Sequence, residues 1–434
     1  MFVKMLPSYA GLTYFGRLFP LKQLLRSSVK KFSSDKSAAV ILGIESSCDD
    51  TGCAIVNTDG VILGEALHSQ RSVHLDNGGI IPPLAGELHR QCITKVVEEA
   101  LVSAGLKLKN IDAIASTVKP GLPMSLRIGT EFGKYLSRIG NLPFIPIHHM
   151  EAHALTIRMT EKVDFPFLVL LISGGHCLIA LAESIDHFLL LGSSMDDAPG
   201  EAFDKIARRL KLRNIPEFAN LSGGAALEKA ASKGTDPNRF QFMIPMTRLQ
   251  DCNFSVSGIK TAAIQHTKRQ ERLHEIEGDQ LIPDLYDFCA GVQLVLTRHL
   301  CHRTQRAMEF IDRKNLIPEG NRTLVVSGGV ACNNYIAQAL ETVSSEMGYK
   351  FLRPVPKLCT DNGIMIAWNG VERWKANCGV LRDQKEIEKV DIDSKALFGE
   401  DWSIFNKSGL YSSNSLLSKT IVSKQLLAVC SGDN

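Results

Sequence analysis

Two stretches of the chain repeat one pattern of apolar and polar positions. In each stretch, short apolar runs alternate with polar turns, which is typical of antiparallel strands joined as a meander. The expected strands are residues 40–44, 53–56 and 61–67 in the first stretch and residues 167–172, 177–181 and 188–191 in the second. The first turn of each meander is rich in small residues. The two stretches therefore predict the same local architecture.

Helical patterns follow each meander. In the first half, a helix is expected over 84–104, between a proline pair and Gly105, and a strand at 113–117 precedes a second helix that runs through Tyr135. In the second half, the expected helices are residues 202–210, 225–231, 259–266 and 285–311, followed by a strand at 323–327 and a helix from Asn333. The sequence thus predicts an α/β protein built from two similar halves that face each other across a cleft lined by their turns.

Length and composition agree with a globular protein of two domains. The 434 residues exceed the size of one ordinary core, and no apolar run is long enough to span a membrane. The 11 cysteines are scattered without any Cys-x-x-Cys pair. A disulfide framework or a zinc knuckle is therefore not expected, and the cysteine pattern favours a reducing compartment.

The amino terminus differs from the rest of the chain. Residues 1–34 carry six lysines and arginines, several serines, a set of apolar residues able to form one helix face, and no acidic residue. This composition is typical of a mitochondrial transit peptide, which we place at residues 1–36; a disordered basic tail is the alternative. Without these six charges acidic residues outnumber basic ones, so any nucleic-acid binding must use a local patch. The clusters at 205–213 and 298–306 are candidates, although such clusters are more often solvated helix faces.

Two histidines after an apolar run suggest a metal site. His149 and His153 are four residues apart, which places both imidazoles on one face of a helix. A third ligand is needed, and Asp361 is the best candidate. The alternative is a helix start with two satisfied histidines and a capping aspartate, and spacing alone leaves both open. A zinc protease would need a glutamate directly after the first histidine, where this chain has Met150.

Three Ser-Gly-Gly turns in the second half favour phosphate binding. They lie at residues 173–175, 222–224 and 327–329, and such turns offer backbone N–H groups without side chains in the way. Asp204, in an early helical turn, could accept hydrogen bonds from ribose hydroxyls, and its alternative role is an exposed helix carboxylate. Nucleotide binding is therefore expected in this half.

Six motifs occur together in one order. They are His149-Met150-Glu151-Ala152-His153, Ile172-Ser173-Gly174-Gly175-His176, Gly200-Glu201-Ala202-Phe203-Asp204-Lys205, Phe254-Ser255-Val256-Ser257-Gly258-Ile259-Lys260, Ser327-Gly328-Gly329-Val330-Ala331-Cys332-Asn333 and Cys359-Thr360-Asp361-Asn362-Gly363. Over residues 40–379 the chain resembles the tRNA N6-adenosine threonylcarbamoyltransferase family, formerly described as O-sialoglycoprotein endopeptidases. With the leader, it resembles the mitochondrial member.

The resemblance implies a fold and a reaction. The fold is the duplicated actin-like, sugar-kinase and Hsp70-like (ASKHA) fold with an interdomain cleft. The reaction transfers threonylcarbamoyl from threonylcarbamoyl-AMP to N6 of adenosine 37 in mitochondrial tRNAs that read ANN codons. A separate synthase would supply the adenylate, and the enzyme would be a homodimer of the mitochondrial matrix.

The resemblance also implies site residues. One divalent metal ion, zinc or iron, is held by His149, His153 and Asp361. The residues expected around the adenylate are Leu171, Ile172, Ser173, Gly174, Gly175, Asp204, Gly224, Glu228, Cys332, Asn333 and Thr360. No general base is assigned.

Three other functions are alternatives: a metallopeptidase, a small-molecule kinase of the same fold class and a non-catalytic scaffold that binds RNA or nucleotides. The same ligand types also occur in ferrous oxygenases, but nothing in the chain suggests the barrel of such an enzyme. For the chain as a whole, four segments are expected: the transit peptide, a first half at 38–150, a second half at 151–379 and a peripheral extension at 380–434.

Overall fold

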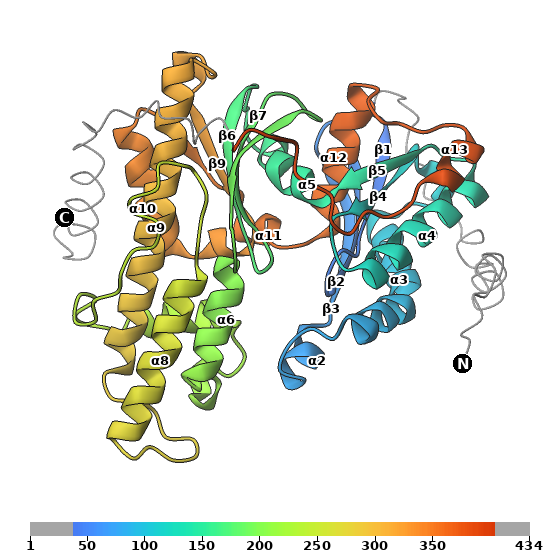
Figure 1. Ribbon diagram of the computed structural model, residues 1–434. Coiled ribbons are helices and arrows are strands. Elements are labelled where there is room, and N and C mark those ends of the chain that lie inside the picture. The colour runs from blue at the N-terminus through green and yellow to red at the C-terminus, as the bar shows by residue number, and fades with distance from the viewer. Residues whose placement is uncertain (1–37, 404–434) are drawn as a thin grey trace, which may run out of the picture. The chain divides into compact units, whose positions relative to one another are not determined.

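The computed structural model describes residues 38–403, which fold into two compact units (Figure 1). Unit 1 contains residues 38–147 and 362–394, and unit 2 contains residues 148–361 and 395–403. The predicted transit peptide and residues 404–434 of the predicted peripheral extension lie outside the described residues. Among the helices that are described, none combines the length and the apolar character needed to cross a membrane.

Unit 1 is built on a five-stranded mixed sheet. Its strand order is β3-β2-β1-β4-β5, in which β1 pairs antiparallel with β2 and parallel with β4. The strands are β1 (Val40–Glu45), β2 (Asp50–Asn57), β3 (Ile62–Ser69), β4 (Ala113–Lys119) and β5 (Phe144–His148). The helices are α2 (Arg71–Asp76), α3 (Pro82–Ala104), η1 (Leu108–Asn110), α4 (Pro123–Gly140), α12 (Gly363–Lys375) and α13 (Gln384–Lys389).

Helices cover both faces of this sheet because side chains of a strand alternate between faces. Leu42 and Ile44 of β1 belong to the core formed with α3 and α4. Ile41 and Gly43 face the other way and lie against α12. Both faces of β1 are therefore buried, and its sequence is apolar from Val40 to Ile44, with the buried Glu45 at its end.

Unit 2 is built on a six-stranded sheet with the order β10-β9-β6-β7-β8-β11. The strands are β6 (Phe167–Ile172), β7 (Cys177–Ala182), β8 (Phe188–Ser193), β9 (Thr323–Ser327), β10 (Lys350–Leu352) and β11 (Glu400–Asp401). The helices are α5 (His149–Leu155), α6 (Pro199–Arg209), α7 (Gly223–Ala231), α8 (Ser257–Leu273), α9 (Leu285–Lys314), α10 (Asn334–Glu346) and α11 (Pro356–Cys359). Short 3-10 turns are η2 (Thr156–Met159), η3 (Leu212–Asn214), η4 (Pro216–Phe218), η5 (Glu319–Asn321) and η6 (Gly329–Cys332).

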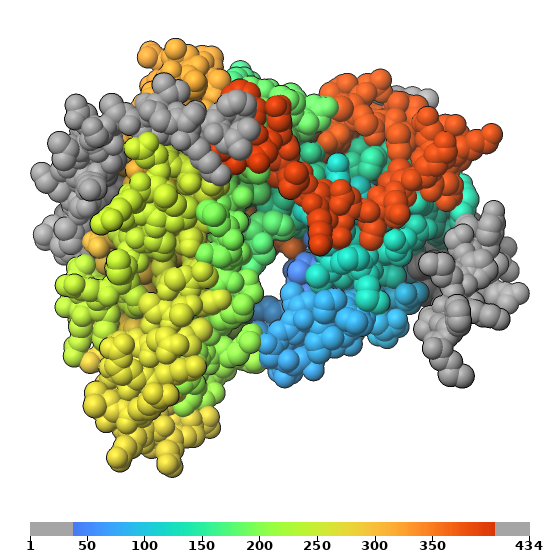
Figure 2. Space-filling view, viewed as in Figure 1, coloured from blue at the N-terminus to red at the C-terminus, as the bar shows by residue number. Residues whose placement is uncertain are grey.

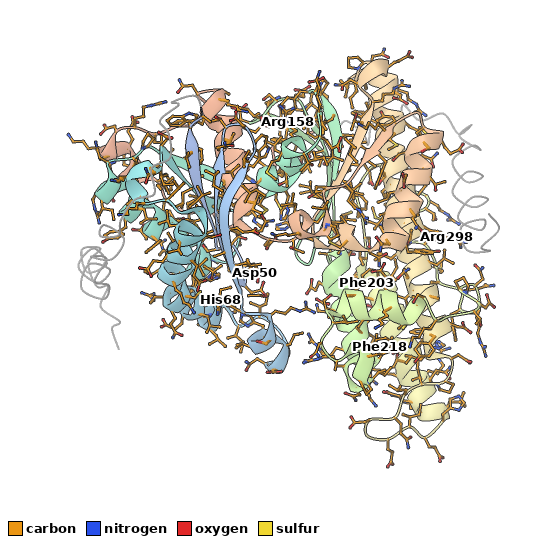
Figure 3. The ribbon with its side chains drawn as sticks, turned by 180° about the vertical axis from the view of Figure 1, so that it is seen from behind. Asp50, His68, Arg158, Phe203, Phe218 and Arg298 are labelled. Atoms are coloured by element: carbon orange, nitrogen blue, oxygen red, sulfur yellow. The ribbon has the colours of Figure 1, made fainter. Side chains whose placement is uncertain are left out.

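Helices α6 to α9 form a large part of unit 2 beside this sheet. Phe203 of α6 and Phe218 of η4 are buried in the core of the unit (Figure 3). Figure 2 shows that the surface of α8 and the segment after it, coloured yellow, forms one end of unit 2. The long helix α9 contacts α7, α8 and α10, so it organises the helical part of the unit.

The predicted architectural repeat is confirmed by the sheets. In both units the three strands of the meander pair antiparallel, and the fourth strand pairs parallel with the first: β1 with β4 in unit 1 and β6 with β9 in unit 2. Each meander also has a register shift between its second and third strands, at Ile55/Val56 and at Ile179/Ala180. The shared strand order and shared irregularity support the duplicated fold that the resemblance implies.

The carboxyl-terminal division differs from the predicted one. Helix α12 packs in unit 1, not in the second half that was expected to extend to residue 379. Gly363 brings the helix backbone against β2, and Gly43 brings β1 against Ala367, at distances that leave no room for a Cβ atom. Close packing of glycines, which periodicity does not reveal, therefore returns this helix to the first sheet.

The expected peripheral extension at 380–434 differs from the structure in its described part, residues 380–403, which contacts the core of each unit. Leu381 pairs with Phe144 of unit 1, and Ile387 of α13 is fully buried in the core of that unit. Farther along, β11 pairs with β8 of unit 2, and Phe398 is buried there. Ile387 and Phe398 are the buried side chains of residues 380–403, and they attach this otherwise largely exposed segment to the cores of the two units.

Candidate metal centre

His148 and His149 have different roles because β5 ends and α5 begins between them. The Nδ1 atom of His148 accepts a hydrogen bond from the backbone N–H of Met150 at 3.2 Å, so His148 is the N-cap of α5. Its Nε2 atom then carries the proton and donates to the carbonyl oxygen of Leu397 at 3.1 Å. His148 is therefore satisfied by the backbone, and His149 is left for another role.

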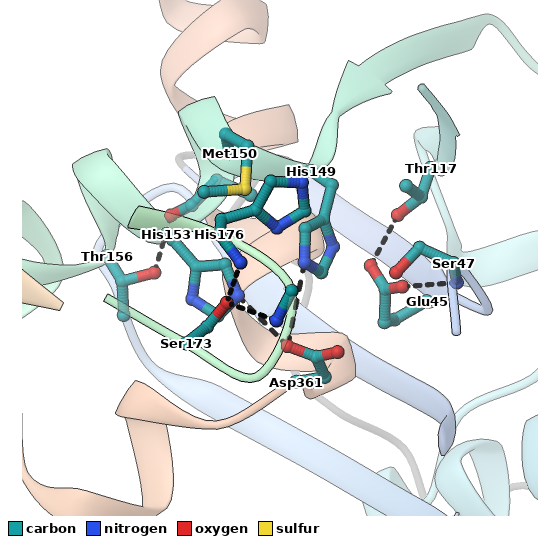
Figure 4. Close-up of polar contacts among 12 residues, drawn as sticks. Glu45, Ser47, Thr117, His149, Met150, His153, Thr156, Ser173, His176 and Asp361 are labelled. Atoms are coloured by element: carbon teal, nitrogen blue, oxygen red, sulfur yellow. Dashed lines mark hydrogen bonds and ion pairs between the residues drawn. The ribbon is translucent and has the colours of Figure 1, made fainter. Parts of the chain in front are cut away.

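The structure also removes the capping alternative for Asp361. The N-cap of α12 is Asn362, whose Oδ1 accepts from the backbone N–H of Met365 at 2.9 Å. Asp361 instead meets the two histidines, as the metal hypothesis requires. Its Oδ1 atom lies 3.0 Å from Nε2 of His153 and 3.6 Å from Nε2 of His149 (Figure 4).

The three side chains form a compact group of possible ligands. One ligand atom from each lies within 4.8 Å of the others. The two imidazole rings are 4.7 Å apart between centroids and nearly perpendicular, at 86°. Both histidines are buried, whereas the Asp361 side chain is 27% exposed. Two imidazoles and one carboxylate directed at one point are a donor set that fits zinc or ferrous iron with positions left open to substrate.

Electrostatics keeps the carboxylate of this group ionised. Burial by itself would raise the pKa of Asp361, but His149 and His153 outweigh that effect and hold the pKa well below its usual range. A deprotonated carboxylate is the form that binds a cation. The site is therefore ready to accept one without first losing a proton from Asp361.

A third histidine, His176, borders this group and was not assigned a role from sequence. Its ring centroid lies 6.3 Å from that of His149, and burial together with His149 lowers the pKa of His176 to about 4. The Ser173 side chain accepts from the backbone N–H of His176 at 3.0 Å, which fixes the turn that carries the ring. The signal in the sequence was a histidine directly after a Gly-Gly turn.

The end of β6 and the turn that follows it contain five of the residues expected near the adenylate. Leu171 and Ile172 end the buried strand β6, and Ser173, Gly174 and Gly175 form the turn. A Cβ atom added to Gly174 or Gly175 would meet nothing within 4 Å. Gly200 of α6, by contrast, lies directly against Ser173 and Gly174, and its backbone N–H donates to the Ser173 carbonyl at 3.1 Å. The turn therefore has open space on one side and the first turn of α6 on the other.

Other expected residues are linked through hydrogen bonds to the backbone. Asp204 of α6 accepts from the N–H of Gly224 at 3.2 Å, and Glu228 of α7 accepts from the N–H of Asn334 at 2.7 Å. Burial raises the pKa of Glu228 above its usual value. These contacts connect α6, α7 and α10, which are distant in sequence.

Three expected residues lie between that region and the metal group: Cys332, Asn333 and Thr360. Asn333 is buried and uses its side chain to cap α10, where Oδ1 accepts from the N–H of Ile336 at 3.0 Å. Cys332 precedes it in η6 and contacts Cys359 of α11. Thr360 lies between Cys359 and Asp361. Contacts between neighbouring segments thus lead from the predicted adenylate residues to the metal group within one unit.

The two basic clusters are largely paired. Lys205 lies 2.6 Å from Glu201, and Arg209 and Lys211 both reach Glu271. Arg303 is fully buried, and its guanidinium donates to the carbonyl oxygens of residues 249 and 251. Arg303 therefore supports a loop and is excluded as a surface contact for RNA.

The chain is similar to known proteins over most of its length. The model of the family "tRNA N6-adenosine threonylcarbamoyltransferase" matches residues 61–368, which include all three candidate metal ligands. A protein of Rattus norvegicus named "tRNA N6-adenosine threonylcarbamoyltransferase, mitochondrial" is 49% identical over 388 residues, which cover 88% of this chain and 92% of the rat protein. The protein of the same name from Homo sapiens is 50% identical over 366 residues, covering 83% and 86% of the two chains.

The chain is less similar to bacterial relatives and to solved structures than to the two mammalian proteins. The tRNA N6-adenosine threonylcarbamoyltransferase of Cereibacter sphaeroides is 41% identical over 366 residues, covering 82% of this chain and 96% of the bacterial protein. Among solved structures, HypF of T. kodakarensis is 15% identical with a TM-score of 0.47, covering 78% of this chain and 48% of that one. The last likeness is too low to support an argument about this chain.

Proposed function

The chain belongs to the tRNA N6-adenosine threonylcarbamoyltransferase family, and on that premise we propose that its reaction takes place at the metal centre of unit 2. The relatives from Rattus norvegicus and Homo sapiens are mitochondrial transferases, and this chain is likewise a mitochondrial enzyme that forms threonylcarbamoyl-adenosine in tRNA. The acceptor is N6 of adenosine 37 in tRNAs that read ANN codons. The donor is threonylcarbamoyl-AMP.

The reaction sets three tasks for the protein. The adenine N6 atom is a weak nucleophile because its lone pair is delocalised into the ring. The donor carbonyl is a mixed anhydride with AMP as a good leaving group. The protein must therefore hold the two reactants at attack distance, bind the AMP phosphate and stabilise the negative charge that develops on oxygen.

His149, His153 and Asp361 would hold the metal ion. The ion, zinc or iron, would supply a Lewis acid for the oxygens of the substrate. The chain's own contribution is geometric: the His148 cap fixes the start of α5, so that both imidazoles face Asp361. The low pKa of Asp361 keeps its charge in place for the ion.

The adenylate would bind beside this group. The backbone N–H groups of the turn formed by Ser173, Gly174 and Gly175 suit phosphate oxygens, since no side chain obstructs the two glycines. Asp204, Gly224 and Glu228 would bind the nucleoside from α6 and α7. Cys332, Asn333 and Thr360 would complete the pocket on the side of η6 and α11.

One observation carries this proposal: the three candidate ligands converge within 4.8 Å although His153 and Asp361 are 208 residues apart in the chain. A metallopeptidase reaction fits this site less well, because the position after His149, where a zinc protease has its general base, is occupied by Met150. We further propose that a separate synthase supplies the adenylate and that the enzyme works as a homodimer.

The test uses the full chain with unmodified tRNA and a synthase that makes threonylcarbamoyl-AMP, followed by mass spectrometry of the nucleosides. We expect wild type to form threonylcarbamoyl-adenosine and the double variant His149→Ala, His153→Ala to lose metal and at least about a hundredfold in activity. His187→Ala is the matched control, since His187 is an exposed histidine of the same unit. Full activity of the metal-free double variant would refute the role of the metal.

The same preparation can identify the ion. The protein is stripped with a chelator and then supplied with zinc or with ferrous iron under anaerobic conditions. We expect one of the two to restore activity at one equivalent per chain. Restoration by neither ion, with the stripped protein still folded, would contradict a catalytic metal at this site.

A further inference from the structure

Two cysteines contact each other close to the candidate metal ligand Asp361, and the proposed reaction does not use the redox chemistry of their thiols. Cys332 ends η6, and Cys359 ends α11, two residues before Asp361. The Sγ atom of Cys332 lies 3.7 Å from the carbonyl oxygen of Pro356, and the Sγ atom of Cys359 lies 3.2 Å from that of Pro354. Both thiols therefore face the same short segment, and the two side chains are in contact with each other.

The two thiols differ in access to solvent. Cys359 is fully buried, whereas Cys332 is partly exposed. A small oxidant can thus reach Cys332 first, and the buried partner is already in contact with it. An exposed thiol beside a second cysteine is the arrangement of a peroxidatic and a resolving cysteine.

The charge environment favours the same order of events. Contact with Cys359 lowers the pKa of the Cys332 thiol, against the opposing effects of burial and of Glu228, and the Arg353 guanidinium acts in the same direction as Cys359. Arg353 is fixed nearby, since it donates to the carbonyl oxygen of Ala331 at 2.8 Å. The thiolate is the form that attacks an oxidant.

We propose that Cys332 and Cys359 form a reversible disulfide in response to a hydroperoxide, and that this disulfide inactivates the adjacent metal centre. The Cys332 sulfur attacks the outer oxygen of the peroxide, the O–O bond breaks, and a sulfenic acid and an alcohol or water are formed. The Cys359 sulfur then attacks the sulfenic sulfur, the S–O bond breaks, and water leaves with the Cys359 proton. Two thiols are oxidised by two electrons, and one peroxide is reduced.

The effect on the site follows from distance. A disulfide bond is about 2.05 Å long, shorter than any contact between two thiols, so its formation draws the end of α11 toward η6. Asp361 follows Cys359 by two residues and would be displaced from the histidines. The disulfide would also remove the Cys332 thiol from the expected adenylate pocket.

The first experiment maps the bond in the wild-type full chain. The metal-loaded protein is treated with hydrogen peroxide, remaining thiols are alkylated, and digested peptides are analysed by mass spectrometry before and after reduction. We expect a Cys332–Cys359 peptide pair that disappears on reduction. Peroxide treatment that leaves both thiols alkylated, or that joins other cysteines instead, would overturn the proposal.

A variant distinguishes a resolving role of Cys359 from mere proximity. In Cys359→Ala, treatment with peroxide and dimedone should label Cys332 as a sulfenic acid that accumulates, whereas wild type should show little label. Cys301→Ala is the control, since Cys301 is fully buried on α9 and burial raises the pKa of its thiol to about 12. This variant should form the disulfide as wild type does, and equal labelling in all three proteins would contradict the assignment.

The inactivation is measured last and rests on the proposed function. Each protein is its own reference, as the ratio of activity and of bound metal before and after peroxide. We expect wild type to lose about tenfold in activity, to release metal, and to regain both after reduction with fresh metal. A mapped disulfide with unchanged metal content and activity would refute the inactivation. If untreated wild type has no transferase activity, the proposed function fails while the disulfide map stands.

Discussion

At the scale of single residues, the different contacts of His148 and His149 determine which of the two is a candidate metal ligand. His148 has both ring nitrogens engaged by the backbone, as acceptor from Met150 and donor to Leu397. His149 lies one position later, in the first turn of α5, where its ring meets His153 and Asp361. Adjacent histidines are thus distinguished by the change from strand to helix between them.

This division predicts opposite results for two neighbouring substitutions. Asparagine is a good N-cap, so His148→Asn should retain one equivalent of metal and lose about 1 kcal/mol of stability with the bond to Leu397. His149→Asn should lose the metal. The measurements are metal content by atomic emission and urea unfolding. Loss of metal from His148→Asn, with the fold intact, would show that the histidine does more than cap the helix.

Asp196 gives unit 2 a dependence on pH that is separate from the metal centre. Partial burial alone would raise its pKa, but hydrogen bonds from Ser255, Val256 and Ser257 outweigh this and lower the pKa of Asp196 to about 2. The folded protein therefore favours the charged form. Its contribution to stability is complete above the ordinary pKa of 3.8 and is lost as the pH falls toward 2.

We expect Asp196→Asn to reduce the free energy of unfolding by about 1 kcal/mol at pH 7, a modest value because the carboxylate is largely exposed. The difference from wild type should shrink between about pH 4 and pH 2. Urea unfolding at a series of pH values measures it, with the exposed turn residue Asp59→Asn as control. A difference that stays constant with pH would show that the hydrogen bonds of Asp196 do not depend on its charge.

At the scale of elements, α12 shows how glycines determine where a helix packs. A Cβ atom on Gly363 would lie 2.4 Å from the backbone of Cys53, and one on Gly370 would lie 2.8 Å from the Ala115 side chain. Helix and sheet therefore approach more closely than ordinary side chains allow. This packing brings a segment more than 200 residues away into unit 1, as the division of the chain shows.

The matched pair Gly363→Ala and Gly258→Ala tests this packing. Both glycines lie in the first turn of a helix, α12 and α8 respectively, but an added Cβ meets nothing within 4 Å at Gly258. We expect Gly363→Ala to destabilise the protein by about 3 kcal/mol through overpacking and Gly258→Ala to be neutral or slightly stabilising. Equal stabilities in chemical denaturation would mean that the contact relaxes without cost.

At the scale of the whole molecule, two units share one strand order, and the end of the described chain contributes to each. Ile387 is buried in unit 1, whereas Phe398 packs in unit 2 with its ring centroid 4.8 Å from that of Phe188. Ile387 and Phe398 thus attach the segment from 380 to 403 to one core each. Their loss should affect stability even where they are remote from the metal ligands.

Neighbouring residues in this segment allow a direct comparison. Phe398→Ala should reduce the free energy of unfolding of unit 2 by about 3 kcal/mol, because it leaves a cavity beside Phe188. Leu397 is 76% exposed, and Leu397→Ala should change stability by less than about 0.5 kcal/mol. Thermal and urea unfolding would show the difference. Similar values for the two variants would indicate that Phe398 does not belong to the core.

The sequence by itself determined the features that depend on spacing along the chain. The two meanders follow from alternating apolar runs, and the pairing of His149 with His153 on one face follows from the helical period. The types of ligand, and the turns suited to phosphate, are likewise local properties.

Only the tertiary structure decided what depends on contacts between distant segments. It showed that His148 and Asn362 provide the caps, that His149 and Asp361 meet as candidate metal ligands, and that His176 borders them. It placed α12 and Ile387 in unit 1 through glycine contacts and burial, and it brought Cys332 against Cys359. The physical reason is that a helix or strand period fixes which residues share a face, whereas the partner of that face is chosen by packing among segments far apart in the chain.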